Sequence, residues 1–219
     1  MGRNPRKCEV CKAELEFNPD NCHNIARLKD KYYHSDCLTE LATKRVQKAK
    51  HAECWDYALE HLDACEKEAK EILTYTYWQD KLNDHLIRHY DVVLPQRFWN
   101  IIADLTNGEF KGKKCKAIPM QDICETWIWA QRKLDEINRS NKMKNTGPKT
   151  DAERVNYDLS IVAGHIGDYK KFIAKQKAEE IERELQKETT KINYDSIAHR
   201  SEIKSEGLDD ISDMIDDFF

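Results

Sequence analysis

The sequence has few of the two residues that most often interrupt helices. Its 219 residues include seven glycines and five prolines, and neither type occurs between Asp20 and Leu94. Turn-rich β folds need Gly and Pro at their many turns, so this scarcity argues against them. Lys, Glu and Ala, which favour helices, are frequent instead. We therefore expect a mainly α-helical chain.

Long apolar runs are also missing. No stretch approaches the roughly 20 apolar residues that span a membrane, and the mean hydropathy is −0.83. The opening residues 1–5 are polar and basic, unlike a signal peptide. Eight cysteines without such a signal indicate reduced thiols and metal ligands rather than disulfides. We expect a cytoplasmic protein with no membrane contact.

Catalytic motifs are absent too. There is no Gly-rich phosphate loop, no G-x-S-x-G, no H-E-x-x-H, and no acidic set typical of a magnesium nuclease. We expect a protein that is not an enzyme.

The strongest motif is a C-x2-C pair followed, after 22 residues, by an H-x2-C pair. Its members are Cys8, Cys11, His34 and Cys37. Zinc binds such Cys3His sets tetrahedrally, and a closed set of four ligands is structural because no position remains for a reacting water. Forty residues cannot bury an adequate core unaided, so a metal would help residues 1–40 to fold. Cys22 or His23 could replace one ligand or bind separately.

Residues 31–37, which hold the second pair and two tyrosines, are predicted to run from a short strand into the first turn of a helix. Ser35 or Asp36 would be the cap of that helix. A C-x2-C knuckle, then an aromatic-H-x2-C knuckle opening a helix, resembles the first half of a LIM domain. The second LIM half is absent after Cys37. The resemblance implies one treble-clef-like zinc finger and, because LIM halves usually bind proteins, an adaptor role.

We predict one long charged helix from about Leu38 to about Trp78, which makes residues 41–78 a separate segment of the chain. Apolar residues recur at three-and-four spacing in a thin, Ala-rich stripe. A thin stripe is typical of a coiled-coil seam, so we expect a possible homodimer through residues 41–78. The alternative is packing of this helix on its own chain.

Residues 79–140 form the predicted helical core domain. Pro95 and Pro119 fit the first turns of two helices, the first of which would end before Gly108. A basic loop joins them, with its lysines at Lys111, Lys113, Lys114 and Lys116. These lysines are candidate nucleic-acid contacts; the alternative is ordinary solvated charge.

Residues 141–150 lack apolar periodicity and contain Gly147 and Pro148, which predicts a linker. Asp151 would cap a further helical segment over residues 151–191. Residues 192–219 would be a flexible tether and an acidic, aromatic docking peptide. The combined pattern, in particular residues 33–37 and 94–129, resembles small accessory proteins of bacteriophages of Gram-positive bacteria.

The acidic tail carries apolar residues at helical spacing and two terminal phenylalanines. They are Ile211, Met214, Ile215, Phe218 and Phe219. One apolar helix face is typical of a peptide that docks in a partner's groove. The segment resembles a sliding-clamp-binding box, with Ser212 at the usual Gln position, and also the tail of bacterial single-stranded-DNA-binding proteins. The alternatives are a solubilising end, or a helix packed on its own domain.

These patterns together predict a mainly α protein with a small N-terminal zinc finger, a long charged helix, a helical bundle core and a flexible acidic tail. We expect a non-enzymatic accessory factor that binds replication or transcription machinery and docks by its tail to a partner such as a sliding clamp. The alternative function is inhibition of a host enzyme or defence nuclease complex through an acidic helical surface.

Overall fold

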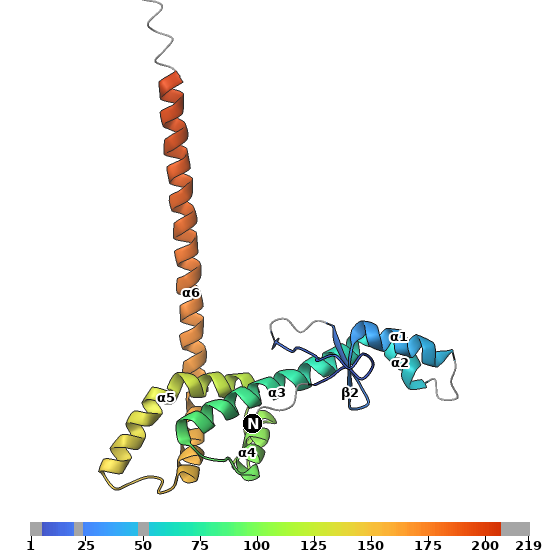
Figure 1. The fold of residues 1–219 in the computed structure, drawn as a ribbon. Coiled ribbons are helices and arrows are strands. Elements are labelled where there is room, and N and C mark those ends of the chain that lie inside the picture. The colour runs from blue at the N-terminus through green and yellow to red at the C-terminus, as the bar shows by residue number, and fades with distance from the viewer. Residues whose placement is uncertain (1–5, 20–23, 48–52, 207–219) are drawn as a thin grey trace, which may run out of the picture. The chain divides into compact units, whose positions relative to one another are not determined.

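The computed structural model describes residues 6–19, 24–47 and 53–206, with side chains up to Glu188 (Figure 1). Most of these residues are helical, which confirms the predicted mainly α class. The helices are α1 (Ser35–Val46), α2 (Glu53–Glu60), α3 (Leu62–Tyr90), α4 (Gln96–Thr106), α5 (Met120–Met143) and α6 (Asp151–Glu206). The strands are β1 (Ile25–Leu28), β2 (Lys31–His34), β3 (Glu109–Phe110) and β4 (Lys113–Lys114). The chain divides into two compact units, residues 1–166 and 167–219.

The β1–β2 hairpin positions the candidate metal ligands. The strands are antiparallel, with Ile25 opposite His34 and Leu28 opposite Lys31. The two turn residues, Lys29 and Asp30, have φ of 48° and 58°. Positive φ at both central residues is typical of a type I′ turn, whose twist matches that of the strands. β1 packs against α3, so the hairpin is attached to the helical body.

An N-terminal cluster of buried apolar residues holds the hairpin, α1, α2 and the first half of α3 together. Its members are Cys8, Leu15, Ile25, Ala26, Leu28, Tyr33, Leu38, Ala42, Ala58, Cys65, Ala69 and Leu73. The prediction of one continuous helix from Leu38 to Trp78 is wrong: α1, α2 and α3 are separate, and α1 packs on α2. His61, between α2 and α3, has φ −129° and ψ 41°, outside the helical region.

The apolar stripe that suggested a homodimer is largely covered by its own chain. Leu38, Ala69 and Leu73 are buried in the N-terminal cluster, and Trp55 and Leu62 pack against it. This intramolecular burial matches the alternative of a segment packed on its own chain. The homodimer through residues 41–78 stays a prediction.

A second, aromatic cluster joins the second half of α3 to α4, α5 and the start of α6. Its members are Trp78, Leu82, Leu86, Tyr90, Phe98, Ile102, Leu105, Met120, Ile123, Cys124, Trp127, Ala130, Leu134, Val155, Leu159, Val162 and Ile166. As predicted, α4 and α5 begin directly after Pro95 and Pro119. The ring centroids of Phe98 and Trp127 lie 6.2 Å apart in an edge-to-face arrangement, which packs α4 on α5.

The helix after the linker is capped differently from the prediction. The Glu153 backbone N–H donates to Thr150 Oγ1 at 3.2 Å, and the Glu153 side chain accepts from the backbone N–H of Lys149 at 2.8 Å. Thr150 and Glu153 therefore form a capping box, and Asp151 is not the cap. The linker is shorter than predicted, because α5 continues to Met143.

α6 also continues beyond its predicted end. Residues 192–206 were expected to be a flexible tether, but the helix extends to Glu206. The docking peptide, residues 207–219, lies outside the described residues. Within the described part of the chain, none of the helices combines the length and apolar character needed to span a membrane.

Candidate metal centre

The first pair of ligands lies in a tight turn. The Cys8 backbone N–H donates to the Ala13 carbonyl at 2.8 Å, and the Lys12 N–H donates to the Cys8 carbonyl at 2.9 Å. Lys12 adopts the left-handed conformation, with φ of 62°, which folds the chain back on itself. An isolated bridge between Lys7 and Glu14 closes the base of the loop. This local structure brings Cys8 and Cys11 together.

The second pair lies at a strand–helix junction, as predicted. His34 is the last residue of β2 and the N-cap of α1, and Cys37 follows in the first helical turn. The predicted cap is wrong, because no side chain caps α1. Instead, the Ser35 hydroxyl donates a hydrogen bond to the Glu66 carboxylate on α3. Asp36 lies in the first turn of α1, where its negative charge interacts favourably with the positive end of the helix dipole.

The two pairs converge on one point. The Sγ atoms of Cys8, Cys11 and Cys37 and a ring nitrogen of His34 all lie within 4.8 Å of one another. His34 Nδ1 is 3.4 Å from Cys11 Sγ and 3.9 Å from Cys37 Sγ. A tetrahedral site with Zn–S bonds of about 2.3 Å and a Zn–N bond of about 2.0 Å has edges of about 3.5–3.8 Å. The four residues could therefore hold one metal ion such as zinc, with Nδ1 as the histidine ligand atom.

The thiols differ in how readily they ionise. Burial opposes ionisation of Cys8 and is the largest single influence, but hydrogen bonds from backbone groups of Cys11, His34 and Val10 outweigh it and lower the Cys8 pKa to about 6. Burial, then the thiols of Cys8 and Cys11, raise the Cys37 pKa to about 11. Because metals bind the thiolate, the low pKa of Cys8 favours a bound cation, whereas Cys37 would have to release its proton to solvent when a metal binds.

Polar contacts fix the first turn to the hairpin. The Glu9 backbone N–H donates to the Tyr32 carbonyl at 2.9 Å, and the Lys31 ammonium pairs with the Glu9 carboxylate at 2.8 Å. The Arg6 guanidinium lies 4.2 Å from the centroid of the Tyr32 ring. These contacts attach the turn that carries Cys8 and Cys11 to the hairpin that ends at His34.

The centre is buried on one side and open on the other. Cys8 is fully buried in the N-terminal cluster, Cys11 is exposed, and His34 and Cys37 are half-buried. Four protein ligands complete a tetrahedral shell, so the arrangement can join the first turn, the hairpin and α1 through one ion. The alternative ligands Cys22 and His23 lie outside the described residues.

The predicted nucleic-acid lysines lie on and beside the β3–β4 hairpin. Lys113 and Lys114 form β4, Lys111 occupies the turn, and Lys116 follows the hairpin. All four are exposed, and Lys111 Nζ donates to Ser160 Oγ on α6 at 2.9 Å. The loop expected from the sequence is thus a short hairpin that touches α6. The predicted docking residues Ile211, Met214, Ile215, Phe218 and Phe219 lie outside the described residues.

A buried polar network was not anticipated. The Asp158 carboxylate is completely buried and accepts hydrogen bonds from the Tyr90 hydroxyl at 2.8 Å and from Asn138 Nδ2 at 2.9 and 3.0 Å. A signal existed in the sequence: Asp158 lies three residues after Val155 and four before Val162, on the apolar face of α6. An acidic residue on such a face indicates a buried, hydrogen-bonded carboxylate.

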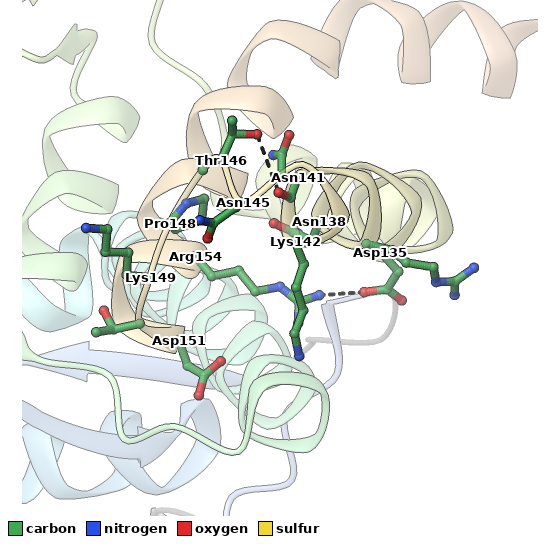
Figure 2. A pocket seen from close by; sticks show the side chains of 13 residues that line it. Asp135, Asn138, Asn141, Lys142, Asn145, Thr146, Pro148, Lys149, Asp151 and Arg154 are labelled. Carbon is green, nitrogen blue, oxygen red and sulfur yellow. Dashed lines mark hydrogen bonds and ion pairs between the residues drawn. The ribbon is translucent and has the colours of Figure 1, made fainter.

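The network borders a polar cavity of about 600 Å³ between the end of α5 and the start of α6. Figure 2 shows Arg154 extending along this cavity to Asp135, with which it pairs at 2.7 Å. The same guanidinium lies 3.7 Å from the Asp158 carboxylate and 4.7 Å from the Tyr90 ring centroid. Its charge is thus used within the fold, where it ties α6 to α5 and α3.

The chain was compared with protein-family models, curated proteins and solved structures. No protein-family model matches the chain, and no curated protein or solved structure is significantly similar to it.

Proposed function

We propose that this chain is a zinc-stabilised, non-enzymatic adaptor of the phage accessory type that binds replication or transcription machinery. The observation that carries the proposal is the closed Cys3His cluster in the N-terminal cluster of buried residues. Zinc is the metal that best suits three thiolates and one imidazole at tetrahedral spacing. With all four positions filled by protein, its role is to hold the module in shape.

Binding rather than catalysis is supported by how the centre is built into the fold. Cys8 is packed among apolar side chains of β1, α1 and α3, so metal binding and folding of this region are coupled. The LIM-like arrangement of the two knuckles favours contact with a protein. The tail, with its apolar positions and terminal phenylalanines, would bind a second partner such as a sliding clamp.

The inhibitor alternative would need an acidic helical surface. From Gly167 to Glu188, α6 carries six acidic residues, at 168, 179, 180, 182, 184 and 188. It also carries six basic ones, at 170, 171, 175, 177, 183 and 187. The balance of the two signs does not favour that alternative, so the adaptor is the better supported proposal.

The test is a pull-down from host lysate with the zinc-loaded intact chain and with a chain ending at Lys204, read by mass spectrometry. We expect replication or transcription proteins with the intact chain, and their loss on truncation. A partner set that is the same for both chains would refute the tail's role. Capture of no such machinery by either chain would refute the adaptor function.

A further inference from the structure

The β3–β4 hairpin and the residues that follow it present four exposed lysines. Lys111 and Gly112 occupy the two central positions with φ of 52° and 74°, as in a type I′ turn. Phe110 lies opposite Lys113 across the hairpin. Within the described part of the chain, Lys113, Lys114 and Lys116 form no ion pair, although Glu109 lies across from Lys114. Their charges are therefore available to an anionic ligand.

A cavity of about 520 Å³ opens beside this hairpin. α4 contributes Arg97 and Ile101 to its walls, and the hairpin contributes Phe110 and Lys111. The remaining lining residues come from α6: Asn156, Tyr157, Leu159 and Ser160. Two of these lining residues are cationic and none is acidic. The recess therefore combines apolar walls with two cationic side chains, on a chain whose net charge is −4.

Two aromatic rings stand beside these cations. Tyr157 lines the cavity with 40% of its surface exposed, and Phe110 is half-buried at the rim. The Lys111 ammonium lies 5.3 Å from the Phe110 ring centroid and is held by Ser160. Rings next to fixed cations can stack on bases while the cations contact phosphates, which is how sequence-tolerant single-strand sites work.

We propose that this recess and hairpin bind single-stranded nucleic acid, with Lys113, Lys114 and Lys116 on the phosphates and Tyr157 stacked on an unpaired base. Paired bases would not expose a face to Tyr157, so a duplex fits less well. The site adds a nucleic-acid contact to the proposed adaptor function. It uses neither the metal centre nor the tail, so that its failure would leave the adaptor function standing.

The test is fluorescence anisotropy of a labelled 15-nucleotide oligo(dT) with the zinc-loaded full chain over a series of salt concentrations. Lys113→Gln with Lys114→Gln removes two phosphate contacts. At about 0.7 per contact in single strands, the slope of log affinity against log salt should fall by about 1.4. The control, Lys67→Gln with Lys70→Gln on the exposed side of α3, makes the same charge change and should leave the slope unchanged.

Tyr157 supplies an independent arm of the test. Tyr157→Ala should weaken binding by between about fivefold and about 150-fold without changing the salt slope, whereas Tyr157→Phe should bind like the original chain. Circular dichroism confirms that each variant is folded. Absence of binding to oligo(dT), or an equal loss in the α3 control, would refute the site. Binding of an acidic peptide in place of oligo(dT), or of a duplex as tightly as the single strand, would also refute it.

Discussion

The hydroxyl of Tyr90 on α3 donates a 2.8 Å hydrogen bond to the buried carboxylate of Asp158 on α6. The same hydroxyl accepts from Trp127 Nε1 on α5 at 3.3 Å. One oxygen atom thus joins three helices in the middle of the aromatic cluster. Burial and the neighbouring Asp158 charge raise the pKa of Tyr90, so the hydroxyl keeps its proton and remains a donor.

Removing that hydroxyl should destabilise the chain. Tyr90→Phe leaves Asp158 without one donor and Trp127 without its acceptor, and such losses cost about 1–3 kcal/mol of unfolding free energy. Urea unfolding measures the change. Tyr157→Phe is the control, because Tyr157 is 40% exposed and should change stability by less than about 0.5 kcal/mol. Equal stability of the two variants would contradict the role of the Tyr90 hydroxyl.

Asp158 should make stability depend on pH. Burial raises its pKa above the ordinary value, although Asn138, Tyr90 and Arg154 act in the opposite direction. The folded chain therefore holds this proton more tightly than the unfolded chain, and the free energy of unfolding falls as pH rises from about 4 through the raised pKa. Asp158→Asn removes this titration. Its stability relative to the original chain should improve with rising pH across that window.

Unfolding in urea at a series of pH values checks the prediction on Asp158. Taking the difference between the two chains cancels the contribution of the metal ligands, which titrate in both. The exposed residue Asp84 provides the control, since Asp84→Asn should give a difference that hardly varies with pH. An advantage of the original chain over Asp158→Asn that grows with pH would have the wrong sign.

Because the four candidate ligands form one site, we expect elemental analysis to find one equivalent of zinc per chain. Cys37→Ala or His34→Ala removes a ligand and should abolish stoichiometric binding, whereas Cys115→Ser, at an exposed cysteine outside the cluster, should keep it. Because metal binding contributes to folding, a chelator should lower the unfolding temperature of the intact chain. A full equivalent of zinc in the Cys37 variant would contradict the ligand assignment.

Two glycines should respond in opposite directions to replacement by alanine. Gly164 lies inside α6 with open space around an added Cβ, so Gly164→Ala should stabilise by about 0.5–1 kcal/mol. Gly108 has a φ of 85°, and an added Cβ would lie 3.0 Å from the Cys115 carbonyl oxygen. Gly108→Ala should therefore destabilise by about 1–2 kcal/mol. Thermal unfolding of both variants would show the contrast; a stabilised Gly108 variant would contradict it.

Substitutions in the tail should weaken binding to its partner without unfolding the chain. Phe218→Ala with Phe219→Ala should abolish capture of the tail's partner while the unfolding temperature stays the same, because aromatic anchors carry most of the binding energy of such peptides. If the partner is a sliding clamp, Ser212→Gln should tighten binding by restoring the usual box. Undiminished capture by the double Phe variant would contradict tail docking.

The sequence allowed prediction of the features that depend on local signals. The ligand set follows from two C-x2-C-like spacings, and the starts of α4 and α5 follow from Pro95 and Pro119. The break at His61 has no such signal, since neither Gly nor Pro lies near it. Apolar residues at three-and-four spacing are expected both in one long helix and in several shorter helices that pack on each other. The periodicity alone therefore cannot distinguish these two arrangements, which differ in their tertiary packing.

Both hairpins were missed for a related reason. The β1–β2 turn uses Lys29 and Asp30 at positive φ, where Asn and Gly are the usual signal, and the strands are only four residues long. The β3–β4 turn does contain Gly112, but its strands have two residues each and show no readable alternation. Residues 192–206 hold only three Glu or Lys residues beside three Ser, an Asn and an Asp, so their composition gives no clear signal for the helix that continues to Glu206.

α3 belongs to both hydrophobic clusters: Cys65, Ala69 and Leu73 serve the N-terminal one, and Trp78, Leu82 and Leu86 serve the aromatic one. The boundary between the clusters therefore runs through the middle of a helix rather than through a loop. A fragment cut before Leu62 to isolate the aromatic half would carry the other three side chains into water and tend to aggregate. A fragment cut within α3 would shorten the helix on which α5 packs. Neither truncation would therefore separate the two hydrophobic clusters without exposing or shortening part of α3.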